Sequence, residues 1–266
     1  MREVRLQWLR PDEINAERAR FPIVYLPIGP LEWHGPHLPL GTDPLQAEHT
    51  AIALAEQIGG VVHPTLYLGT ERERSSELLG HLGFHGDEWI VGMDFPANNE
   101  RSYYYSEDVF AIMMRFTLEQ LVTHGYQWIV LVNGHGATNQ IEQLQRLAAE
   151  FTQHGPAKVI YTFDLDADLD DDAGHATITE TSAVMALKRD RVDLDRLPPP
   201  NQPLYNIEYA IVDANTFGGQ PTPDHTVRPA ADPRQATIEL GQNHFTVTVE
   251  RIARKVRAEL NQRSGG

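Results

Sequence analysis

Short apolar runs that alternate with longer helical patterns constrain the fold of this chain more than any other feature of its 266 residues. The runs span residues 21–28 (FPIVYLPI), 61–68, 128–132 (WIVLV) and 159–163. They are apolar nearly throughout rather than at every second position, which is typical of strands that are covered on both faces. The sequence therefore predicts an α/β fold with a mostly parallel sheet.

The helical patterns fill the stretches between and after these runs. Asp43 stands near the start of one predicted helix, and Gly59 follows its end. Ser106 can cap another helix, which Gly125 can end. The predicted helices span residues 43–58, 106–124, 140–153, 180–188 and 236–259.

A proline-rich stretch, residues 196–203 (RLPPPNQP), could join two domains. The residues that follow it, 204–232, are loop-like and lack the periodic apolar pattern that a second core would need. A chain of this length buries about 70–75% of the surface of its unfolded form, which is enough for a core without cross-links. We therefore expect a single domain over residues 1–266.

Composition excludes several classes of partner and location. The sequence has 22 Lys and Arg against 37 Asp and Glu, a formal net charge of -15, so the phosphates of a nucleic acid would be repelled. It has no cysteine, which excludes disulfides and zinc–thiolate sites. No apolar run reaches the roughly 18 residues of a membrane span, and the charged N-terminus does not fit a signal peptide. We expect a cytoplasmic protein that binds neither nucleic acid nor a membrane.

Side chains that can bind a metal ion follow the first predicted strand. Glu32, His34 and Asp43 lie in the stretch LPIGPLEWHGPHLPLGTD, residues 26–43. Open α/β sheets bind ligands at the carboxyl ends of their strands, and an extended backbone projects Glu32 and His34 to the same side. Histidine and carboxylate ligands suit zinc, manganese or iron. The alternative is a polar loop with a solvated Glu32 and hydrogen-bonded side chains at His34 and His37.

A glycine-rich turn follows the run 128–132. Residues 133–139 are NGHGATN, so that His135 also stands at the carboxyl end of a predicted strand. The glycines allow a tight strand-to-helix turn and a close approach of the backbone. The start of the next helix could instead bind an anion, but the Walker pattern with its lysine is absent. A plain turn with an exposed histidine is the other alternative.

A third polar cluster, residues 175–182 (HATITETS), stands at the start of the predicted helix 180–188. Glu180 can lie in the first turn of this helix, with Thr179 or Thr181 as its cap. Taken alone, the cluster is ordinary capping chemistry. Together with the other two clusters it favours one convergent site.

The three clusters together give the chain a resemblance to the creatininase family, the creatinine amidohydrolase-like metal hydrolases. The matching segments are residues 26–43, 132–140 (VNGHGATNQ) and 174–182 (GHATITETS), and residues 232–242 are similar to the C-terminal region of that family. The resemblance implies a three-layer α/β/α fold with a central, mostly parallel sheet. It also implies a centre of two divalent metal ions, which would be Zn, Mn or Fe.

The resemblance also assigns ligands by motif position. Glu32 and His135 would bind one ion, His34 would bind the other, and Asp43 would bridge both. Creatininase itself has a Glu two residues after the His of the N-G-H motif, where this chain has Ala137. We therefore expect Glu180, in the E-T-S motif, to supply the missing ligand. This departure puts creatinine itself in doubt as the substrate.

Such a centre implies hydrolysis. Two divalent ions would lower the pKa of a bridging water from about 16 to about 7 and so supply hydroxide at neutral pH. The leaving nitrogen then needs a proton. His175 is the best candidate for the general acid, since an unperturbed His titrates at about 6.5. The alternative is that His175 orients Glu180, and we expect a similar supporting role for His37.

Other segments are less specific. The resemblance places substrate contacts after the second predicted strand, where Ser75, Ser76 and His85 are candidates, although a solvated charged loop is the alternative. The three tyrosines at 103–105 could line a pocket but are more typical of a core or a subunit contact. The acidic run 164–172 lacks the Gly and Glu of an EF-hand loop, so we expect an acidic loop beside the site.

The sequence thus predicts a metal-dependent amidohydrolase that acts on a C–N bond of a small amide, with cyclic amides such as creatinine among the options. Related branches of the family act on formamides, on peptide bonds and on a cyclic inosose ketone, so ring opening of a ketone or lactone-like sugar derivative is the alternative. A metal-binding scaffold or sensor is the non-enzymatic alternative. A serine hydrolase would need a G-x-S-x-G elbow, which is absent. The resemblance also implies a homo-oligomer, commonly a hexamer.

Overall fold

A parallel sheet forms the centre of the molecule. The structure is a computed structural model that describes residues 2–81, 84, 88–164, 174–207, 210–212 and 226–263. The strand order is β2-β1-β4-β5, β3 also pairs with β1, and each of these pairs is parallel. The strands are β1 (Ile23–Gly29), β2 (Val61–Val62), β3 (Leu66–Tyr67), β4 (Trp128–Asn133) and β5 (Lys158–Phe163).

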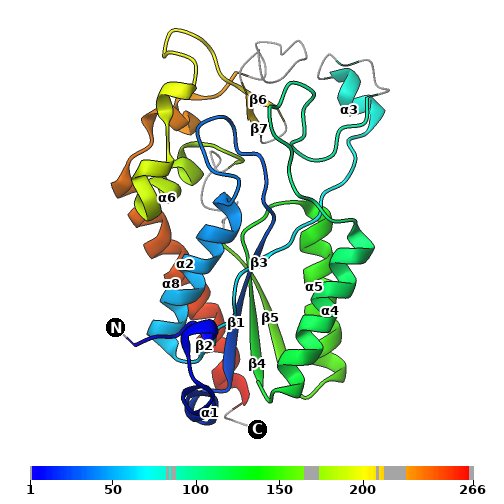
Figure 1. Ribbon diagram of the computed structural model, residues 1–266, viewed down its shortest axis with the longest axis vertical. Coiled ribbons are helices and arrows are strands. Elements are labelled where there is room, and N and C mark those ends of the chain that lie inside the picture. The colour runs from blue at the N-terminus through cyan, green and yellow to red at the C-terminus, as the bar shows by residue number, and fades with distance from the viewer. Residues whose placement is uncertain are drawn as a thin grey trace.

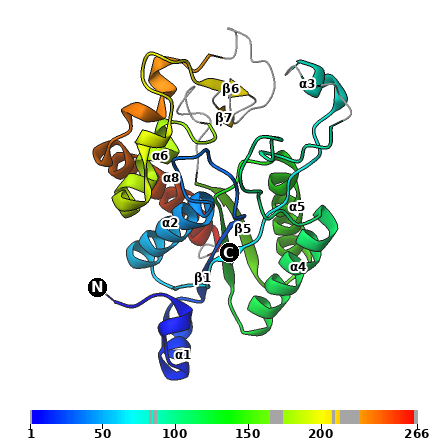
Figure 2. The same cartoon turned by 45° about the horizontal axis from the view of Figure 1, so that its top comes forward.

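Helices cover both faces of this sheet (Figure 1). On one side lie α2 (Thr42–Ile58) and α8 (Ile238–Arg263), with α6 (Ile178–Lys188) packed on α8. On the other side lie α4 (Glu107–Thr123) and α5 (Thr138–His154), and Figure 2 shows the same separation from a second direction. The predicted three-layer α/β/α fold is therefore confirmed.

The two central strands explain the apolar runs in the sequence. Every residue of β1 and β4 is buried. Side chains of β4 alternate between two cores: Val130 packs with residues of α2 and α8, whereas Leu131 packs with residues of α4 and α5. Because both faces of the strands are buried, both sets of side chains must be apolar.

The prediction of one strand over residues 61–68 is wrong. Two short strands, β2 and β3, pair with different parts of β1, and residues 63–65 separate them. Pro64 stands in this interruption, and proline has no N–H to donate to a neighbouring strand. The prediction of a loop over residues 204–232 is also incomplete, because this segment contains an antiparallel pair of strands, β6 (Tyr205–Ile207) and β7 (Ala210–Val212).

Of the two predicted helix caps, one is confirmed in position and the other is wrong. Ser106 is the N-cap residue of α4, as predicted, but its hydroxyl makes no capping bond and donates instead to Asp108 Oδ1 at 2.5 Å. Helix α6 begins earlier than predicted, so that its N-cap is Thr177 rather than Thr179 or Thr181. Propensity places a cap to within a few residues, and the tertiary contacts of the first turn decide which residue takes that place.

The remaining described elements lie around the layers. They are the helices α1 (Pro11–Arg20) and α3 (Ser76–His81) and the 3-10 turns η1 (Leu6–Trp8), η2 (Arg189–Arg191), η3 (Leu194–Arg196), η5 (Pro229–Ala231) and η6 (Pro233–Gln235). Across the described part of the chain, no helix is both long enough and apolar enough to cross a membrane.

Candidate metal centre

Six polar side chains from different parts of the chain meet at the carboxyl end of the sheet. Two follow β1, one lies in the first turn of α2, one follows β4, and two stand at the start of α6. All six are buried, and none is more than 9% exposed. The residues are Glu32, His34, Asp43, His135, His175 and Glu180.

The local backbone explains how these side chains come together. The Glu32 N–H donates to Leu40 O at 2.8 Å, which closes the loop after β1 on itself. At Gly134, a Cβ atom would lie 2.3 Å from Asp43 O. Only a glycine therefore lets the start of α2 approach the end of β4 so closely, which brings Asp43 beside His135.

The side chains form two groups of ligand atoms that share Asp43. One group is Glu32, Asp43 and His135, and the other is His34, Asp43 and Glu180; within each, the ligand atoms lie within 4.8 Å of one another. Asp43 Oδ1 is 2.8 Å from His34 Nε2, and Asp43 Oδ2 is 3.0 Å from His135 Nδ1. The two oxygens of one carboxylate thus face different groups.

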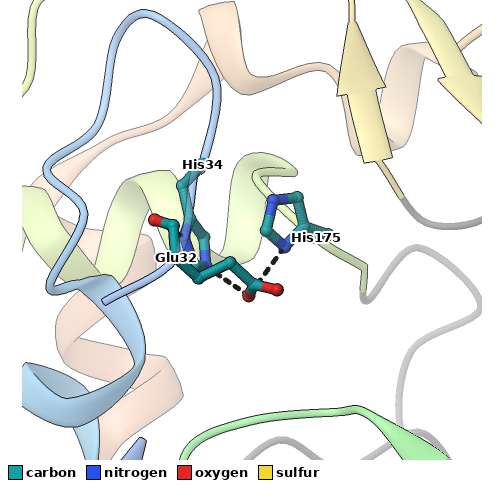
Figure 3. Close-up of side chains that lie close together, drawn as sticks. All are labelled: Glu32, His34 and His175. Carbon is teal, nitrogen blue, oxygen red and sulfur yellow. Dashed lines mark hydrogen bonds and ion pairs between the residues drawn. The ribbon is translucent and has the colours of Figure 1, made fainter. Parts of the chain in front are cut away.

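His175 lies across the Glu32 carboxylate from His34 (Figure 3). Its Nε2 is 2.6 Å from Trp33 O, a contact in which the ring must donate, and its Nδ1 is 3.5 Å from Glu32 Oε2. Glu180 Oε2 accepts instead from the N–H of Ala176 at 2.5 Å. Ala176 has a φ of 58°, a left-handed conformation that a non-glycine residue seldom adopts outside sites where the surroundings impose it.

Burial and mutual charge shift the pKa values of the imidazoles strongly. Burial alone would lower the pKa of His34, but the carboxylates of Asp43 and Glu180 outweigh it and hold that pKa well above its ordinary value. The pKa of His135 is raised in the same way by Glu32 and Asp43. Positive charge is therefore favoured at both imidazoles.

The two carboxylates between these imidazoles respond in opposite directions. Burial raises the pKa of Glu32 above its ordinary value, although the charge of His135 opposes this shift. Burial would also raise the pKa of Asp43, but the neighbouring His34 and His135 outweigh it and lower that pKa. In His175, burial and the charge of His34 hold the pKa well below its ordinary value, so that this ring stays neutral.

These residues fit divalent metal ions. His34 Nε2 lies 2.8 Å from Asp43 Oδ1 and 3.6 Å from Glu180 Oε2, contacts that lack the geometry of a good hydrogen bond. A buried ring nitrogen in this state is ready to bind an ion instead. Three carboxylates supply negative charge, and imidazole with carboxylate is a donor set that suits zinc, manganese or iron.

Tyr104 also contacts this centre, although the sequence does not distinguish it from Tyr103 and Tyr105. Its hydroxyl donates a short hydrogen bond to Glu32 Oε1. Burial and the charge of Glu32 raise the pKa of Tyr104 well above its ordinary value, so the hydroxyl keeps its proton. The neighbouring residues Tyr103 and Tyr105 are exposed. The three tyrosines therefore do not share one place, either in a core or in the wall of a pocket.

Asp164 is a second residue whose burial the sequence does not indicate. It belongs to the acidic run expected beside the site, directly follows β5 and is buried. Among the residues that the structure describes, neither of its side-chain oxygens has a hydrogen-bond partner. Burial, followed by the charges of Asp43 and Glu180, raises the pKa of Asp164 well above its ordinary value.

We expect the Asp164→Asn variant of the metal-free protein to be more stable than the wild type at pH 8. The carboxyl binds its proton more tightly in the folded protein than in the unfolded chain. In the wild type, the bound proton therefore stabilises the fold fully below the unfolded pKa of about 4. This stabilisation is lost as the pH rises through the raised pKa of the folded protein. Urea unfolding of chelator-treated protein should show a gain of about 1–3 kcal/mol at pH 8 and a smaller gain at pH 5.

The control for this experiment is Asp195→Asn, because Asp195 is exposed. This variant should unfold like the wild type at both pH values. Equal stability of Asp164→Asn and wild type at pH 8 would contradict an uncompensated charge at Asp164.

The other predicted site residues lie outside the six. His37 is buried, its Nε2 is 3.0 Å from Thr181 Oγ1, and burial with the charge of His34 lowers its pKa to about 3. Ser75 and Ser76 are exposed. His85 and residues 165–172 of the acidic run lie outside the described part of the chain.

Comparison with known proteins extends these findings. A family model described as "Creatininase: Creatinine amidohydrolase" matches residues 7–256. Creatinine amidohydrolase of Pseudomonas putida is 27% identical over 259 residues, which cover 90% of each chain. The mycofactocin precursor peptide peptidase of Mycolicibacterium smegmatis is 30% identical over 191 residues, which cover 66% of this chain and 62% of that protein.

Solved structures show the same fold. A manganese form of creatininase has a TM-score of 0.67 at 25% identity, over 97% of this chain and 99% of the other. A Zn–Zn form of a creatininase mutant has a TM-score of 0.67 at 24% identity, with the same coverage. The central parallel sheet and its two helical layers are therefore shared with proteins that have been solved with these metals.

Proposed function

The chain belongs to the creatininase family of metal-dependent amidohydrolases, and from this premise we propose that it hydrolyses a C–N bond of a small amide, with a cyclic amide as the preferred substrate. One observation carries the proposal. The two groups of ligand atoms, Glu32 with His135 and His34 with Glu180, share the carboxylate of Asp43. In this arrangement Glu32 and His135 would help to hold one divalent ion, His34 and Glu180 would help to hold another, and Asp43 would serve both.

Metal ions bound there would supply a strongly acidified water and would polarise a substrate carbonyl. The residues of the chain do the rest. Glu32, Asp43 and Glu180 would offset most of the positive charge of the ions, and the burial of the site limits the access of bulk water. In the overall reaction, oxygen from water is added to the carbonyl carbon, the C–N bond breaks, and the nitrogen gains a proton.

We assign the proton transfer to His175. Its Nε2–H is held by Trp33 O, so that Nδ1 is the nitrogen that faces the centre. Because burial and the charge of His34 keep the ring neutral, Nδ1 can accept the proton that the attacking water loses and pass it to the leaving nitrogen. His175 therefore acts as a proton shuttle rather than as a permanently charged acid.

Removal of the metal should abolish the activity. We expect chelator-treated protein to be inactive, and Mn²⁺, Zn²⁺ or Fe²⁺ to restore turnover, because each accepts both imidazole and carboxylate ligands. Mg²⁺ and Ca²⁺ should not restore it, since they prefer oxygen ligands. Metal analysis and an activity assay after each addition provide the measurement. Full activity of protein shown to contain no metal would refute the proposal.

The substrate class is tested on the metal-loaded enzyme. Creatinine and other small cyclic amides, an N-formyl amine, a short peptide and a keto-inositol are incubated in parallel, and the products are identified by mass spectrometry. We expect ring-opened products from one or more of the cyclic amides. Turnover of the keto-inositol alone would overturn the proposal in favour of ring opening at a ketone.

A second candidate is hydrolysis of a peptide bond. It is favoured by the similarity to the mycofactocin precursor peptide peptidase, which at 30% exceeds the identity to creatinine amidohydrolase but covers less of the chain. The chemistry of the C–N bond is the same in both cases, and the two differ in the size of the substrate. Cleavage of the short peptide without any turnover of cyclic amides would select this candidate.

A further inference from the structure

We propose that Tyr104 is a positioning residue that fixes Glu32 as a one-oxygen ligand of the ion held by Glu32, Asp43 and His135. The inference rests on the proposed metal centre and adds to it a residue that acts through Glu32. It starts from the unequal surroundings of the two oxygens of one carboxylate.

The two carboxylate oxygens of Glu32 contact different groups. Oε1 accepts the hydrogen bond from the Tyr104 hydroxyl. Oε2 faces the imidazoles instead, at 3.4 Å from His135 Nδ1, 3.5 Å from His175 Nδ1 and 3.8 Å from His34 Nε2. Figure 3 shows this oxygen between His34 and His175. The tyrosine thus occupies one oxygen and leaves the other to the centre.

The backbone around Tyr104 holds the side chain in this position. The Tyr103 N–H donates to Leu31 O at 2.7 Å, directly beside Glu32, and the Tyr105 N–H donates to Gly69 O at 2.9 Å. Successive side chains of an extended segment point to opposite sides. Tyr103 and Tyr105 are accordingly exposed, at 57% and 40%, while Tyr104 turns inward.

A second contact decides the direction of the hydroxyl proton. The backbone N–H of Met93 donates to the Tyr104 hydroxyl oxygen at 3.3 Å. Because an N–H can only donate, the hydroxyl accepts there, and its own proton is directed to Glu32. The hydroxyl is therefore a donor to Glu32 and cannot compete with it for the ion.

Gly92 provides the space that this arrangement needs. Its φ is +53°, and a Cβ at this position would lie 2.6 Å from the Tyr104 hydroxyl oxygen and 2.4 Å from Glu71 Cγ. A side chain here would displace the hydroxyl from Glu32. Residues of two separate segments, 92–93 and 103–105, thus position the one hydroxyl that donates to Glu32 Oε1.

The test is the Tyr104→Phe variant, which removes the hydroxyl and keeps the ring. Metal-free protein is titrated with Mn²⁺ alone, and the affinity of each binding step is measured by calorimetry and by the paramagnetic resonance of bound Mn²⁺. We expect one of two binding steps to weaken by about 10- to 100-fold, as is usual when a partner of a metal ligand is lost. The other step should stay within about 3-fold of the wild type.

Tyr103→Phe and Tyr105→Phe are matched controls, because they make the same chemical change on exposed neighbours. Both should bind Mn²⁺ like the wild type. Gly92→Ala is an independent variant that keeps the hydroxyl but displaces it, and it should weaken the same step as Tyr104→Phe. Thermal unfolding of each metal-free variant separates an effect on the ion from an effect on the fold.

Each outcome has one meaning. Unchanged Mn²⁺ affinities in Tyr104→Phe overturn the inference, whether or not the metal-free variant unfolds earlier. Equal weakening of both steps also overturns it, because a role through Glu32 must affect one group more than the other. A wild type that binds no Mn²⁺ would instead refute the proposed metal centre, so the two failures are distinguishable.

Discussion

We expect the Asp43→Ala variant to bind no metal ion tightly and to lose hydrolysis by at least about 10³-fold, or about 4 kcal/mol of transition-state stabilisation. Asp43 belongs to both groups of ligand atoms that we propose hold the ions. Its Oδ1 faces His34 at 2.8 Å and its Oδ2 faces His135 at 3.0 Å. Alanine removes an anionic ligand from each group at once.

Elemental analysis of the purified variant, after incubation with Mn²⁺ or Zn²⁺, measures the loss directly. Glu56→Ala is the matched control, because Glu56 is an exposed acid on the same helix, α2. This control should keep both its metal and its activity. Two ions retained per chain in Asp43→Ala would refute the bridging role of Asp43.

The second large effect is expected for His175→Ala. This variant should keep its metal ions and lose turnover by about 10²- to 10⁴-fold, the usual contribution of a positioned acid or base. The ligand atoms of the two proposed groups do not include His175, and its Nδ1 lies 3.5 Å from Glu32 Oε2, within reach of a group bound at the centre. The proton that the leaving nitrogen needs then has no donor.

Metal content and kcat are both measured for this variant, because His175 also forms a group of its own with Glu32 and His34. A lower metal content would make His175 a ligand rather than the acid. Full activity would remove the acid role altogether. His124→Ala, at an exposed histidine after α4, is the control and should behave like the wild type.

The central strands could be predicted because burial on both faces leaves a continuous apolar run. The runs 21–28, 128–132 and 159–163 became β1, β4 and β5, with boundaries shifted by a residue or two. The short antiparallel strands were harder to predict. Strands β6 and β7 have three residues each, too few for a periodic pattern to appear.

The meeting of the candidate ligands could be predicted as far as the motifs reach. Glu32, His34 and Asp43 follow one strand, His135 follows another, and Glu180 stands at the start of a helix. The structure brings these residues together. Side chains at the carboxyl ends of adjacent parallel strands share one edge of the sheet, so their convergence follows from the fold class.

The sequence by itself determined the α/β class and the candidate ligands of the proposed metal centre, because apolar runs and short motifs are local properties of the chain. Only the tertiary structure decided that Tyr104 donates to Glu32, 72 positions away, and that the side chain of Asp164 is buried. In the sequence alone, neither residue can be told apart from the tyrosines or acidic residues beside it. Their roles come from hydrogen bonds and burial between distant segments, which form only when those segments pack together.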